Sequence, residues 1–505
     1  MQSNVHYRNF HTRKTMNRKI KYILVSLLVS VFVVACSDDA DFSSDPSLRL
    51  EFSGDTISFD TLFTEIGSPT ASFTVFNRNG SSLRVNSVAL GGGDSSPFRV
   101  NVDGQYGNDI RDVEIRKNDS IFVFVNVALD RNDRDIPFEV RDSLVFTLES
   151  GHRQWVQLVA YGQDATVLRA PLFDSDTTLA AGAYIIHDSL TVADGCRLAL
   201  SEGCSLYFHS GAWMNVRGSL SALGSKGRPV VFRGDRTDNL FDYLPYDRVP
   251  GQWGGITFQP TSNGNILDHC DLHSANYGLR MLSGDTTVQR LTVTNSSICN
   301  FSGNAFECEN ARVDVGNTLI ANAGGNCVKV VGGSVRFVHC TIANFYVWTQ
   351  RETALALHNM LEGSVAPLRE ALFANCVISG SKNDEIMGYL YELGDTIPDG
   401  ANYRFVSSLL NTRPAADDDE NFVNIVWDDK EITPFGKEHF ALVDNSIYKY
   451  DFHLDSLSSA RGIADGAYSA LFSVDLDGVA RPVENGDAGC FQYVEVESGK
   501  VKTEM

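Results

Sequence analysis

The chain has 505 residues, with 42 Lys or Arg against 63 Asp or Glu, so its formal net charge is −21 at pH 7. A surface this acidic repels nucleic acid, and we expect no nucleic-acid partner. The length is sufficient for two or more hydrophobic cores. The 42 glycines, with abundant Val, Phe, Thr and Ser, favour strands joined by turns, so almost no helix is expected outside inserted loops.

The first 35 residues have the composition of a leader. They contain six Lys or Arg and no Asp or Glu, and they end in the apolar run of residues 23–35. This run is too short to span a bilayer as a helix, but it is typical of a signal-peptide core. A translation start at Met16, directly before a second basic stretch, stays open.

Cys36 directly follows the apolar run, in the sequence Val-Val-Ala-Cys of residues 33–36. This segment resembles the lipobox of bacterial lipoproteins. The resemblance implies that residues 1–35 are a cleaved signal peptide and that Cys36 carries acyl chains such as palmitate, which anchor the protein to a membrane. A plain secretory signal with an incidental cysteine is the alternative.

Residues 36–46 are polar and acidic without apolar periodicity, which predicts a flexible tether. The acidic pair Asp38 and Asp39 resembles the surface-export signal of Bacteroidetes lipoproteins. That resemblance implies a location in the cell outer membrane, with the protein facing the medium.

Short alternating runs fill residues 47–165, among them residues 98–102 and 121–127, and turn clusters such as residues 77–80 separate them. This spacing is typical of an antiparallel sandwich, which we interpret as an immunoglobulin-like module. Residues 55–64 resemble the N-terminal sandwich that precedes β-helices in Bacteroidetes lipoproteins. The resemblance implies a spacer or docking module without catalytic residues.

Residues 166–495 contain repeats of about 22 residues, the period of a solenoid. An Asn/His-x-x-Ile/Leu core recurs with starts 26, 22, 22 and 36 residues apart. Because residues two apart in a strand share a face, stacked coils would form two inward rows, the core of a parallel β-helix. The core starts are His269, Asn295, Asn317, His339 and Asn375. The predicted rows are Cys270, Ser296, Thr318, Cys340 and Cys376, and Leu272, Ile298, Ile320, Ile342 and Ile378.

Both ends of this region resemble right-handed parallel β-helix proteins of the pectin-lyase-like type. Gly-terminated short strands lead to Trp-Gly-Gly-Ile at residues 253–256, and an Asp-x-x-Gly-x-x-Arg-Pro motif begins at Asp475. The chain departs from the closing motif at Cys490 and Gln492. The expected fold class is therefore all-β, an immunoglobulin-like β-sandwich followed by a right-handed parallel β-helix solenoid.

Two inserted loops are expected, at about residues 346–371 and 382–450, with a polar tail at residues 496–505. The first has apolar residues at helix-like spacing between Leu355 and Leu361. Trp348 and Trp427 in these loops are candidates for stacking on sugar rings, or they simply cover the flank of the solenoid.

The pectin-lyase-like family includes lyases with an Arg or Lys base and Asp-bound calcium, and hydrolases with a cluster of Asp residues. The best local candidates for such catalysis are Asp268, Asp271, His273 and Arg280, on neighbouring coils. No partner carboxylate recurs at matching points of the next two coils, so solvated surface residues are the alternative.

Two groups of residues could bind a metal, and each also has a structural interpretation. The His/Asn row that starts at His269 would be a metal array or, as we favour, a hydrogen-bonded ladder at a coil corner. Asp475, Asp477 and Asp487 would bind calcium near Gly478, or form a capping turn clasped by Arg481 over the solenoid end. Apart from this calcium, no cofactor is expected.

Nine cysteines follow Cys36, an odd number without CxxC spacing, which favours buried side chains over a disulfide framework. Taken together, the sequence predicts a lipid-anchored surface protein, a non-catalytic glycan-binding or adhesion module whose partners are the membrane and a polysaccharide. The alternatives are a polysaccharide lyase or glycoside hydrolase acting on acidic polysaccharide, and a structural envelope component.

Overall fold

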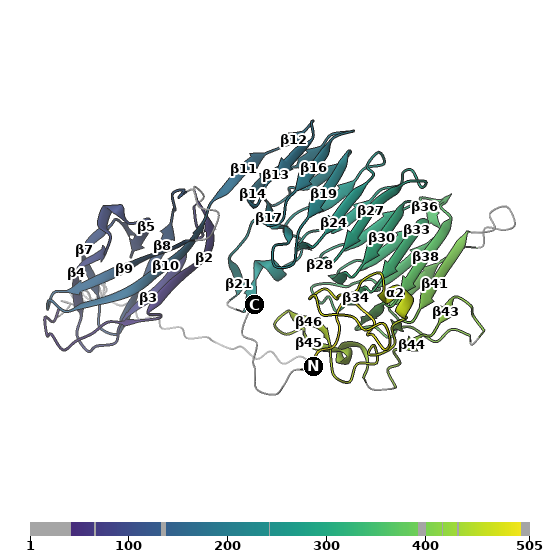
Figure 1. Cartoon of the computed structure of the whole chain (residues 1–505). Helices are drawn as coiled ribbons and strands as arrows, with labels where there is room; N and C mark the ends of the chain where they lie inside the picture. The colour runs from purple at the N-terminus through teal and green to yellow at the C-terminus, as the bar shows by residue number, and fades with distance from the viewer. Residues whose placement is uncertain are drawn as a thin grey trace, which may run out of the picture. The chain divides into compact units, whose positions relative to one another are not determined.

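The computed structural model contains two compact units, each described here by itself (Figure 1). No helix among the described residues is long and apolar enough to cross a membrane. Cys36, the signal peptide and residues 496–505 lie outside the described part. The structure describes residues 42–64, 67–132, 138–241, 243–391, 400–416, 418–431 and 434–495.

The first unit is a sandwich of two five-stranded sheets, named here the β1 sheet and the β2 sheet. Phe73 of the β1 sheet meets Phe146 of the β2 sheet edge-on, with ring centroids 6.4 Å apart, so the two sheets face each other. The antiparallel sandwich is confirmed, and its immunoglobulin-like topology stays a prediction. The β1 sheet contains β1 (Glu51–Phe52), β3 (Ala71–Asn77), β8 (Asp119–Val127), β5 (Phe98–Val102) and β6 (Gln105–Tyr106). The β2 sheet contains β2 (Thr56–Phe63), β10 (Arg153–Gln163), β9 (Phe138–Leu148), β4 (Leu83–Leu90) and β7 (Asp109–Ile115), and the 3-10 turn η1 (Gly93–Ser95) follows β4.

The second unit is a parallel β-helix, as predicted. Each coil visits three parallel sheets in turn, named here by their first strands (Figure 1). The β11 sheet contains β11 (Ala165–Arg169), β14 (Gly182–His187), β17 (Cys204–Phe208), β20 (Val230–Gly234), β25 (Cys270–His273), β28 (Ser297–Phe301), β31 (Leu319–Ala323), β34 (Thr341–Asn344), β39 (Val377–Gly380), β42 (Leu409–Leu410) and β44 (Val426–Trp427). The β12 sheet contains β12 (Leu172–Phe173), β15 (Leu190–Val192), β18 (Met214–Val216), β23 (Ile256–Phe258), β26 (Leu279–Met281), β29 (Phe306–Glu309), β32 (Val328–Val331), β35 (Leu355–His358) and β40 (Ile386–Tyr389). The β13 sheet contains β13 (Thr177–Leu179), β16 (Arg197–Leu200), β19 (Ser219–Leu223), β24 (Asn265–Asp268), β27 (Gln289–Thr294), β30 (Arg312–Gly316), β33 (Gly333–Val338), β38 (Leu368–Ala374), β41 (Ala401–Val406) and β43 (Phe422–Val423).

The core of the solenoid consists of the inward rows that the repeat predicted. The aliphatic row runs in direct register from Leu272 to Ile378, and it continues to Leu410 at one end and Phe232 at the other. The predicted Cys/Ser/Thr row is buried as well, and Cys270, Cys340 and Cys376 are free thiols. In-register stacking therefore places like side chains on like side chains along the core.

A single residue in left-handed conformation forms each corner between the β13 sheet and the β11 sheet. The corner residues form the predicted ladder: Asn317 Nδ2 donates to Asn295 Oδ1 at 2.8 Å, and Asn375 Nδ2 lies 2.9 Å from His339 Nε2. Asn tolerates positive φ, which explains its frequency here. The corner φ values are 49° at His269, 50° at Asn295, 49° at Asn317, 53° at His339 and 52° at Asn375.

Both expected insertions contain strands of regular coils as well as residues outside the coils, and the helix-like segment of the first insertion is a strand. Leu355 and Leu357 are buried in β35, which pairs in parallel with β32, rather than in a helix. Stacking on an existing coil decides this, since local helix-like spacing cannot outweigh in-register burial. The second region supplies β40 to β44, and β41 and β42 belong to one more coil. The hairpins outside the coils are β21 (Asn239–Phe241) with β22 (Leu244–Pro245), followed by η2 (Tyr246–Arg248), and β36 (Met360–Leu361) with β37 (Ser364–Val365).

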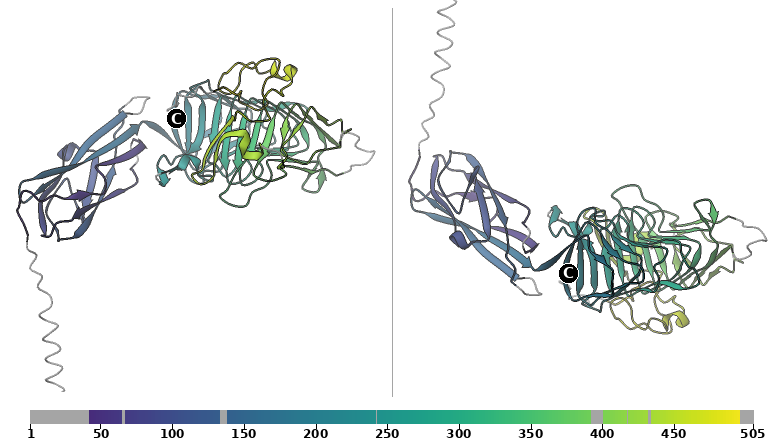
Figure 2. Two further views of the ribbon diagram at one scale, coloured as in Figure 1. Left: turned by 90° about the horizontal axis from the view of Figure 1, so that it is seen from below. Right: turned by 90° about the horizontal axis from the view of Figure 1, so that it is seen from above.

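Residues 436–493, named here the cover segment, pack on the outer face of the β11 sheet. Phe440, Phe452 and Phe491 form one buried cluster with outward residues of the coils such as Phe345 and Val377. Figure 2 shows this yellow segment along the flank of the solenoid. The predicted position of the closing motif over the solenoid end is therefore wrong, because the apolar outer face of this sheet attracts it. The cover segment contains η3 (Gly436–His439), β45 (Phe440–Asp444), β46 (Lys449–Leu454) and α2 (Gly466–Ser469).

Candidate functional site

The four predicted catalytic residues do not form one site. Asp268 ends β24 of the β13 sheet, Asp271 and His273 lie in β25 of the β11 sheet, and Arg280 lies in β26 of the β12 sheet. Successive strands of one coil belong to different sheets, so their outward side chains leave the solenoid in different directions. Proximity in sequence is therefore misleading in this fold.

Asp268, Asp271 and His273 have structural partners. Asp268 Oδ1 accepts hydrogen bonds from Thr294 Oγ1 and Asn295 Nδ2, both at 2.7 Å, so it starts the corner ladder. His273 Nε2 lies 3.9 Å from the Asp271 carboxylate, and its Nδ1 lies 3.0 Å from the Ser274 hydroxyl. These contacts fit the surface interpretation of all three residues.

Arg280 belongs to a charged row on the outer face of the β12 sheet. In register along this row, Thr257 precedes Arg280, and Glu307 and Lys329 follow it. Lys329 Nζ donates to Glu307 Oε1 at 2.8 Å, while Arg280 Nε lies 3.4 Å from Glu307 Oε2. Arg280 Nη2 is 3.7 Å from Glu309 Oε1. The row thus presents two cations and two carboxylates on neighbouring coils.

The Arg280 guanidinium has donors that form no hydrogen bond among the described residues. Its contacts with Glu307 and Glu309 are ion pairs without hydrogen-bond geometry, and its Nε is a buried donor without a hydrogen-bond partner among the described residues. The side chain is 42% exposed. A guanidinium is planar and has five hydrogen-bond donors. When ion pairs hold it in place without using these donors in hydrogen bonds, it suits the bidentate binding of an anion such as a carboxylate.

Arg280 lines a shallow depression of about 440 Å³. The exposed rings of Trp213 and Tyr277 lie at this depression, 58% and 45% accessible. Two glycines permit this arrangement: a Cβ at Gly254 would lie 2.6 Å from Trp213 Cβ, and one at Gly303 would lie 2.6 Å from Tyr277 Cε1. The remaining lining residues are Thr257, Asn276 and Ser302.

Further along the same sheet, His358 stacks on Tyr389 with ring centroids 4.5 Å apart and an interplanar angle of 17°. Burial lowers the pKa of His358, and the nearby Lys329 lowers it further. Burial also raises the pKa of Glu309, assisted by the negative charge of Glu307. Sequence reasoning missed Trp213, Tyr277 and Glu307. For Trp213 and Glu307 the signal is the register between coils, whereas Tyr277 lies three residues before Arg280 in the same coil.

Trp348 and Trp427 do not line this depression. Trp348 is partly buried and stacks on Tyr448 at 4.3 Å, and Trp427 ends β44, packed against Phe422 and the solenoid core. The flank-covering alternative therefore describes Trp348, whereas Trp427 continues the inward row after Leu410 at the last coil.

The three candidate calcium ligands have other partners. Asp487 accepts from the Gly462 amide at 2.8 Å, Asp475 from the Gln492 amide at 2.8 Å, and Asp477 Oδ2 lies 2.8 Å from His453 Nε2. Within the described ranges, no group of three His, Cys, Asp or Glu side chains has the arrangement of a metal site.

Arg481 is buried, and its Nη2 donates to Asn317 Oδ1 at 2.6 Å. It therefore joins the closing turn to the corner ladder. His339 in that ladder is surrounded: its Nδ1 lies 3.2 Å from the Gly489 carbonyl and its Nε2 3.1 Å from the Ser469 hydroxyl. Burial, aided by Arg481, lowers the pKa of His339 to about 3. The ladder thus anchors the cover segment, which supports the structural interpretation.

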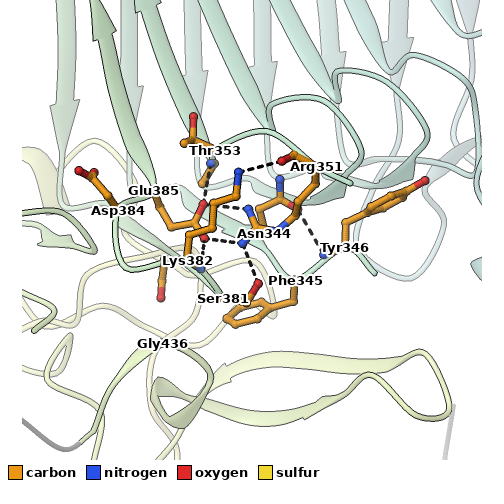
Figure 3. Close-up of polar contacts among 12 residues, drawn as sticks. Asn344, Phe345, Tyr346, Arg351, Thr353, Ser381, Lys382, Asp384, Glu385 and Gly436 are labelled. Atoms are coloured by element: carbon orange, nitrogen blue, oxygen red, sulfur yellow. Dashed lines mark hydrogen bonds and ion pairs between the residues drawn. The ribbon is translucent and has the colours of Figure 1, made fainter. Parts of the chain in front are cut away.

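A buried ion pair connects two turns that lead from the β11 sheet to the β12 sheet (Figure 3). Arg351 donates to both carboxylate oxygens of Glu385, at 2.5 and 3.0 Å, and the side chains are 5% and 0% exposed. Glu385 also accepts from the backbone amides of Lys382 at 2.7 Å and Ala354 at 3.0 Å. Figure 3 shows these contacts converging on the carboxylate, which is inaccessible and therefore structural.

A second buried chain of polar groups links Ser458, His439 and Asp428. His439 Nδ1 lies 3.5 Å from the Ser458 hydroxyl and its Nε2 3.0 Å from Asp428 Oδ1. These residue types match a hydrolytic triad, but the three residues are at most 5% exposed. Substrate cannot reach the hydroxyl. These three hydrogen-bonded side chains therefore hold η3 and the following turn on the solenoid.

Comparisons with known proteins identify no family. No family model and no curated protein matches the chain. Among solved structures, the chain is similar to the VesB protease of Vibrio cholerae at 14% identity over 22% of this chain and 31% of the protease, with a TM-score of 0.17. A family 123 glycoside hydrolase from Clostridium perfringens matches at 11% identity over 26% of this chain and 30% of the hydrolase, with a TM-score of 0.18. A Porphyromonas gingivalis protein of unknown function matches at 18% identity over 25% of this chain and 60% of its own, with a TM-score of 0.18.

Proposed function

We propose that this protein is a lipid-anchored lipoprotein of the bacterial cell surface, of the Bacteroidetes type, that binds an acidic glycan without cleaving it. The glycan lies on the outer face of the β12 sheet. Lipid attachment at Cys36 and export to the outer membrane rest on the leader and the acidic tether alone.

The glycan assignment rests on one observation. The guanidinium of Arg280, whose Nε has no hydrogen-bond partner among the described residues, lies in a depression that is also lined by the exposed rings of Trp213 and Tyr277. Aromatic rings stack on the apolar faces of sugars, and a guanidinium forms paired hydrogen bonds with a carboxylate. Thr257, Asn276 and Ser302 supply polar groups for sugar hydroxyls. A polymer of uronic acids offers these features at each residue.

The direct test is binding of oligogalacturonate and of an uncharged oligosaccharide of equal length. Arg280→Gln is expected to weaken oligogalacturonate binding about tenfold to a hundredfold, because a charged hydrogen-bonding interaction contributes about 1.5–3 kcal/mol. Arg336→Gln is the matched control, since Arg336 lies in the β13 sheet with 45% exposure and a single ion pair at 3.9 Å. Equal effects of both substitutions, or equal affinity for the two sugars, contradict the proposal.

A polysaccharide lyase or hydrolase is the second candidate function, and one observation favours it. The raised pKa of Glu309, beside Arg280, suits a group that donates or accepts a proton. Polygalacturonate incubated with the protein then yields unsaturated products that absorb ultraviolet light, or new reducing ends, and Glu309→Gln abolishes both. Binding without either product supports the non-catalytic function. A folded protein with neither binding nor products indicates a structural envelope component.

Two further parts of the proposal have separate tests. Incorporation of labelled palmitate into the protein in cells, lost in Cys36→Ala, tests lipidation. Protease digestion of intact cells tests exposure to the medium. We propose that binding needs no calcium, because Lys329 already pairs with Glu307 at 2.8 Å, so EDTA is expected to leave oligogalacturonate affinity unchanged.

A further inference from the structure

The sandwich has two chemically different outer faces. That of the β2 sheet is charged: Arg84 pairs with Glu114 at 2.9 Å and Glu149 at 3.8 Å, and Arg111 pairs with Asp109 at 2.5 Å. Two exposed aromatic residues, Trp155 and Tyr161 of β10, also lie in the β2 sheet. The outer face of the β1 sheet presents four aromatic side chains, named here the aromatic face. Its members are Phe76, Tyr106, Phe122 and Phe124, of which the last three are 83%, 58% and 44% exposed.

The aromatic face is flat and central in its sheet. Phe122 and Phe124 lie two residues apart on β8, the middle strand, with ring centroids 6.3 Å apart and an interplanar angle of 27°. In the pairing registers, Phe124 lies opposite Asn101, and Asn101 lies opposite Tyr106. Exposed aromatic rings on a central strand are unusual for a surface that contacts only water, and they mark a contact site.

The chain enters the sandwich at the turn between β3 and β4, where the ring of Phe42 lies 4.5 Å from the guanidinium of Arg84 on the β2 sheet. Phe42, the first described residue, bridges to Ser82 in the turn after β3, and β3 carries Phe76 near its end at that turn. The guanidinium of Arg78, in the same turn, lies over the Phe76 ring at 4.3 Å. Phe42 is the sixth residue after Cys36, so an extended tether reaches about 20 Å at most.

We infer that the aromatic face rests on the interface of a lipid bilayer and forms a second membrane contact beside the acylated Cys36. This inference rests on the proposed lipid attachment, which holds Phe42, at the end of the sandwich where β3 and Phe76 end, within about 20 Å of the membrane. Aromatic rings are favoured at the boundary between lipid headgroups and acyl chains. The rings of the aromatic face carry no charge that could pair with anionic headgroups, so the contact is with zwitterionic lipid.

The second contact has a physical purpose. One membrane-binding element alone gives reversible attachment, whereas two acting together hold a protein firmly. Contact through the aromatic face also restricts how the sandwich is oriented on the membrane, which a tether alone does not.

Co-sedimentation with phosphatidylcholine vesicles tests the inference, using the chain from Ser37 to Met505, which lacks leader and acyl group but keeps all described residues. The wild type is expected to partition to vesicles, and the double variant Phe122→Ser, Phe124→Ser to partition at least about tenfold less. Trp155→Ser is the matched control: Trp155 is 63% exposed in β10 of the β2 sheet, and its loss leaves partitioning unchanged. Equal melting temperatures show that all variants fold.

Each other outcome overturns the inference. Wild type that stays in solution, or a double variant that sediments like wild type, excludes the aromatic face as a lipid contact. A wild type that dimerises without binding vesicles, while the double variant is monomeric, assigns the face to a second copy of the chain. Failure of palmitate labelling at Cys36 would remove the lipid anchor without changing the vesicle result, so the two proposals fail independently.

Discussion

The outer faces of the β11 sheet and the β12 sheet belong to the same coils, yet they serve different purposes. Outward residues of the β11 sheet, such as Val377 and Leu409, are apolar and buried under the cover segment. Outward residues of the β12 sheet, such as Arg280 and Lys329, are charged and 42% and 30% exposed. The solenoid core alone does not distinguish the faces. The outward positions do, because apolar ones must be covered and charged ones stay in water.

The largest effect is expected at the turns that join the two faces. Arg351→Met leaves the fully buried Glu385 without its partner, which is expected to destabilise the solenoid by about 3–5 kcal/mol. Thermal unfolding of wild type and variant measures this loss. The control Arg336→Met breaks an exposed pair with Glu370, for which at most about 1 kcal/mol is expected. A variant as stable as this control would show that the buried pair is dispensable.

The next prediction compares the two faces directly. Phe452→Ala removes a ring that packs under the cover segment, 5% exposed, and is expected to cost about 3–5 kcal/mol. Met387→Ala on the β12 sheet removes a side chain that is 37% exposed, and less than about 1 kcal/mol is expected. Limited proteolysis should also release the cover segment only from the first variant. Similar costs at both positions would refute the distinction between a covered and an open face.

A smaller effect is expected where the corner ladder holds the cover segment. Asn317→Ala removes the acceptor of Arg481 and the donor to Asn295, which is expected to cost about 1–3 kcal/mol. Asn317→Gly separates the two causes, since glycine adopts the local φ of 49° freely but forms no side-chain hydrogen bond. If the glycine variant is as stable as wild type, backbone conformation and not the hydrogen bonds explains the asparagine.

The smallest effect is a pH dependence inside the cover segment. Burial, the largest single contribution, lowers the pKa of His453, but hydrogen bonds to Asp451 and Asp477 and their charges outweigh it and raise the pKa to about 9. Because the folded pKa exceeds the unfolded value of 6.5, the stabilisation is complete below pH 6.5 and is lost as the pH rises through 9. The melting temperature of His453→Gln is therefore expected to lie below that of wild type at pH 6 and to equal it at pH 10. A difference that persists at pH 10 would rule out this ion pair as its cause.

Much of the fold could be predicted from local patterns. The inward rows of the solenoid were predicted residue by residue, because strands alternate with period two and the repeat recurs with constant spacing between Asn295 and His339. The corner ladder followed from Asn and its tolerance of positive φ. The strands β35 and β40 inside the expected insertions could not be predicted, since they join the solenoid only by pairing with neighbouring coils.

Of the four residues that the sequence predicted for a catalytic site, only Arg280 lines the depression. Arg280 lies in the depression, but Asp268, Asp271 and His273 lie on strands of other sheets. Trp213 comes from another coil and approaches Arg280 only through the stacking of β18, β23 and β26, whereas Tyr277 lies three residues before Arg280 in the same coil. The juxtaposition of Trp213 and Arg280 depends on the register between coils, which the sequence of one coil does not contain.

The amino-acid sequence by itself determined the leader pattern that ends at Cys36, the all-β character, the solenoid and the identity of its inward rows. These features depend on periodicities within a few residues, which local steric and hydrophobic effects impose. Only the tertiary structure decided that the closing motif covers a flank, that the aromatic residues of β8 form one exposed face, and that Arg280 has aromatic neighbours. These features depend on which outer surfaces meet after the coils have stacked, and that is set by burial over long sequence separations.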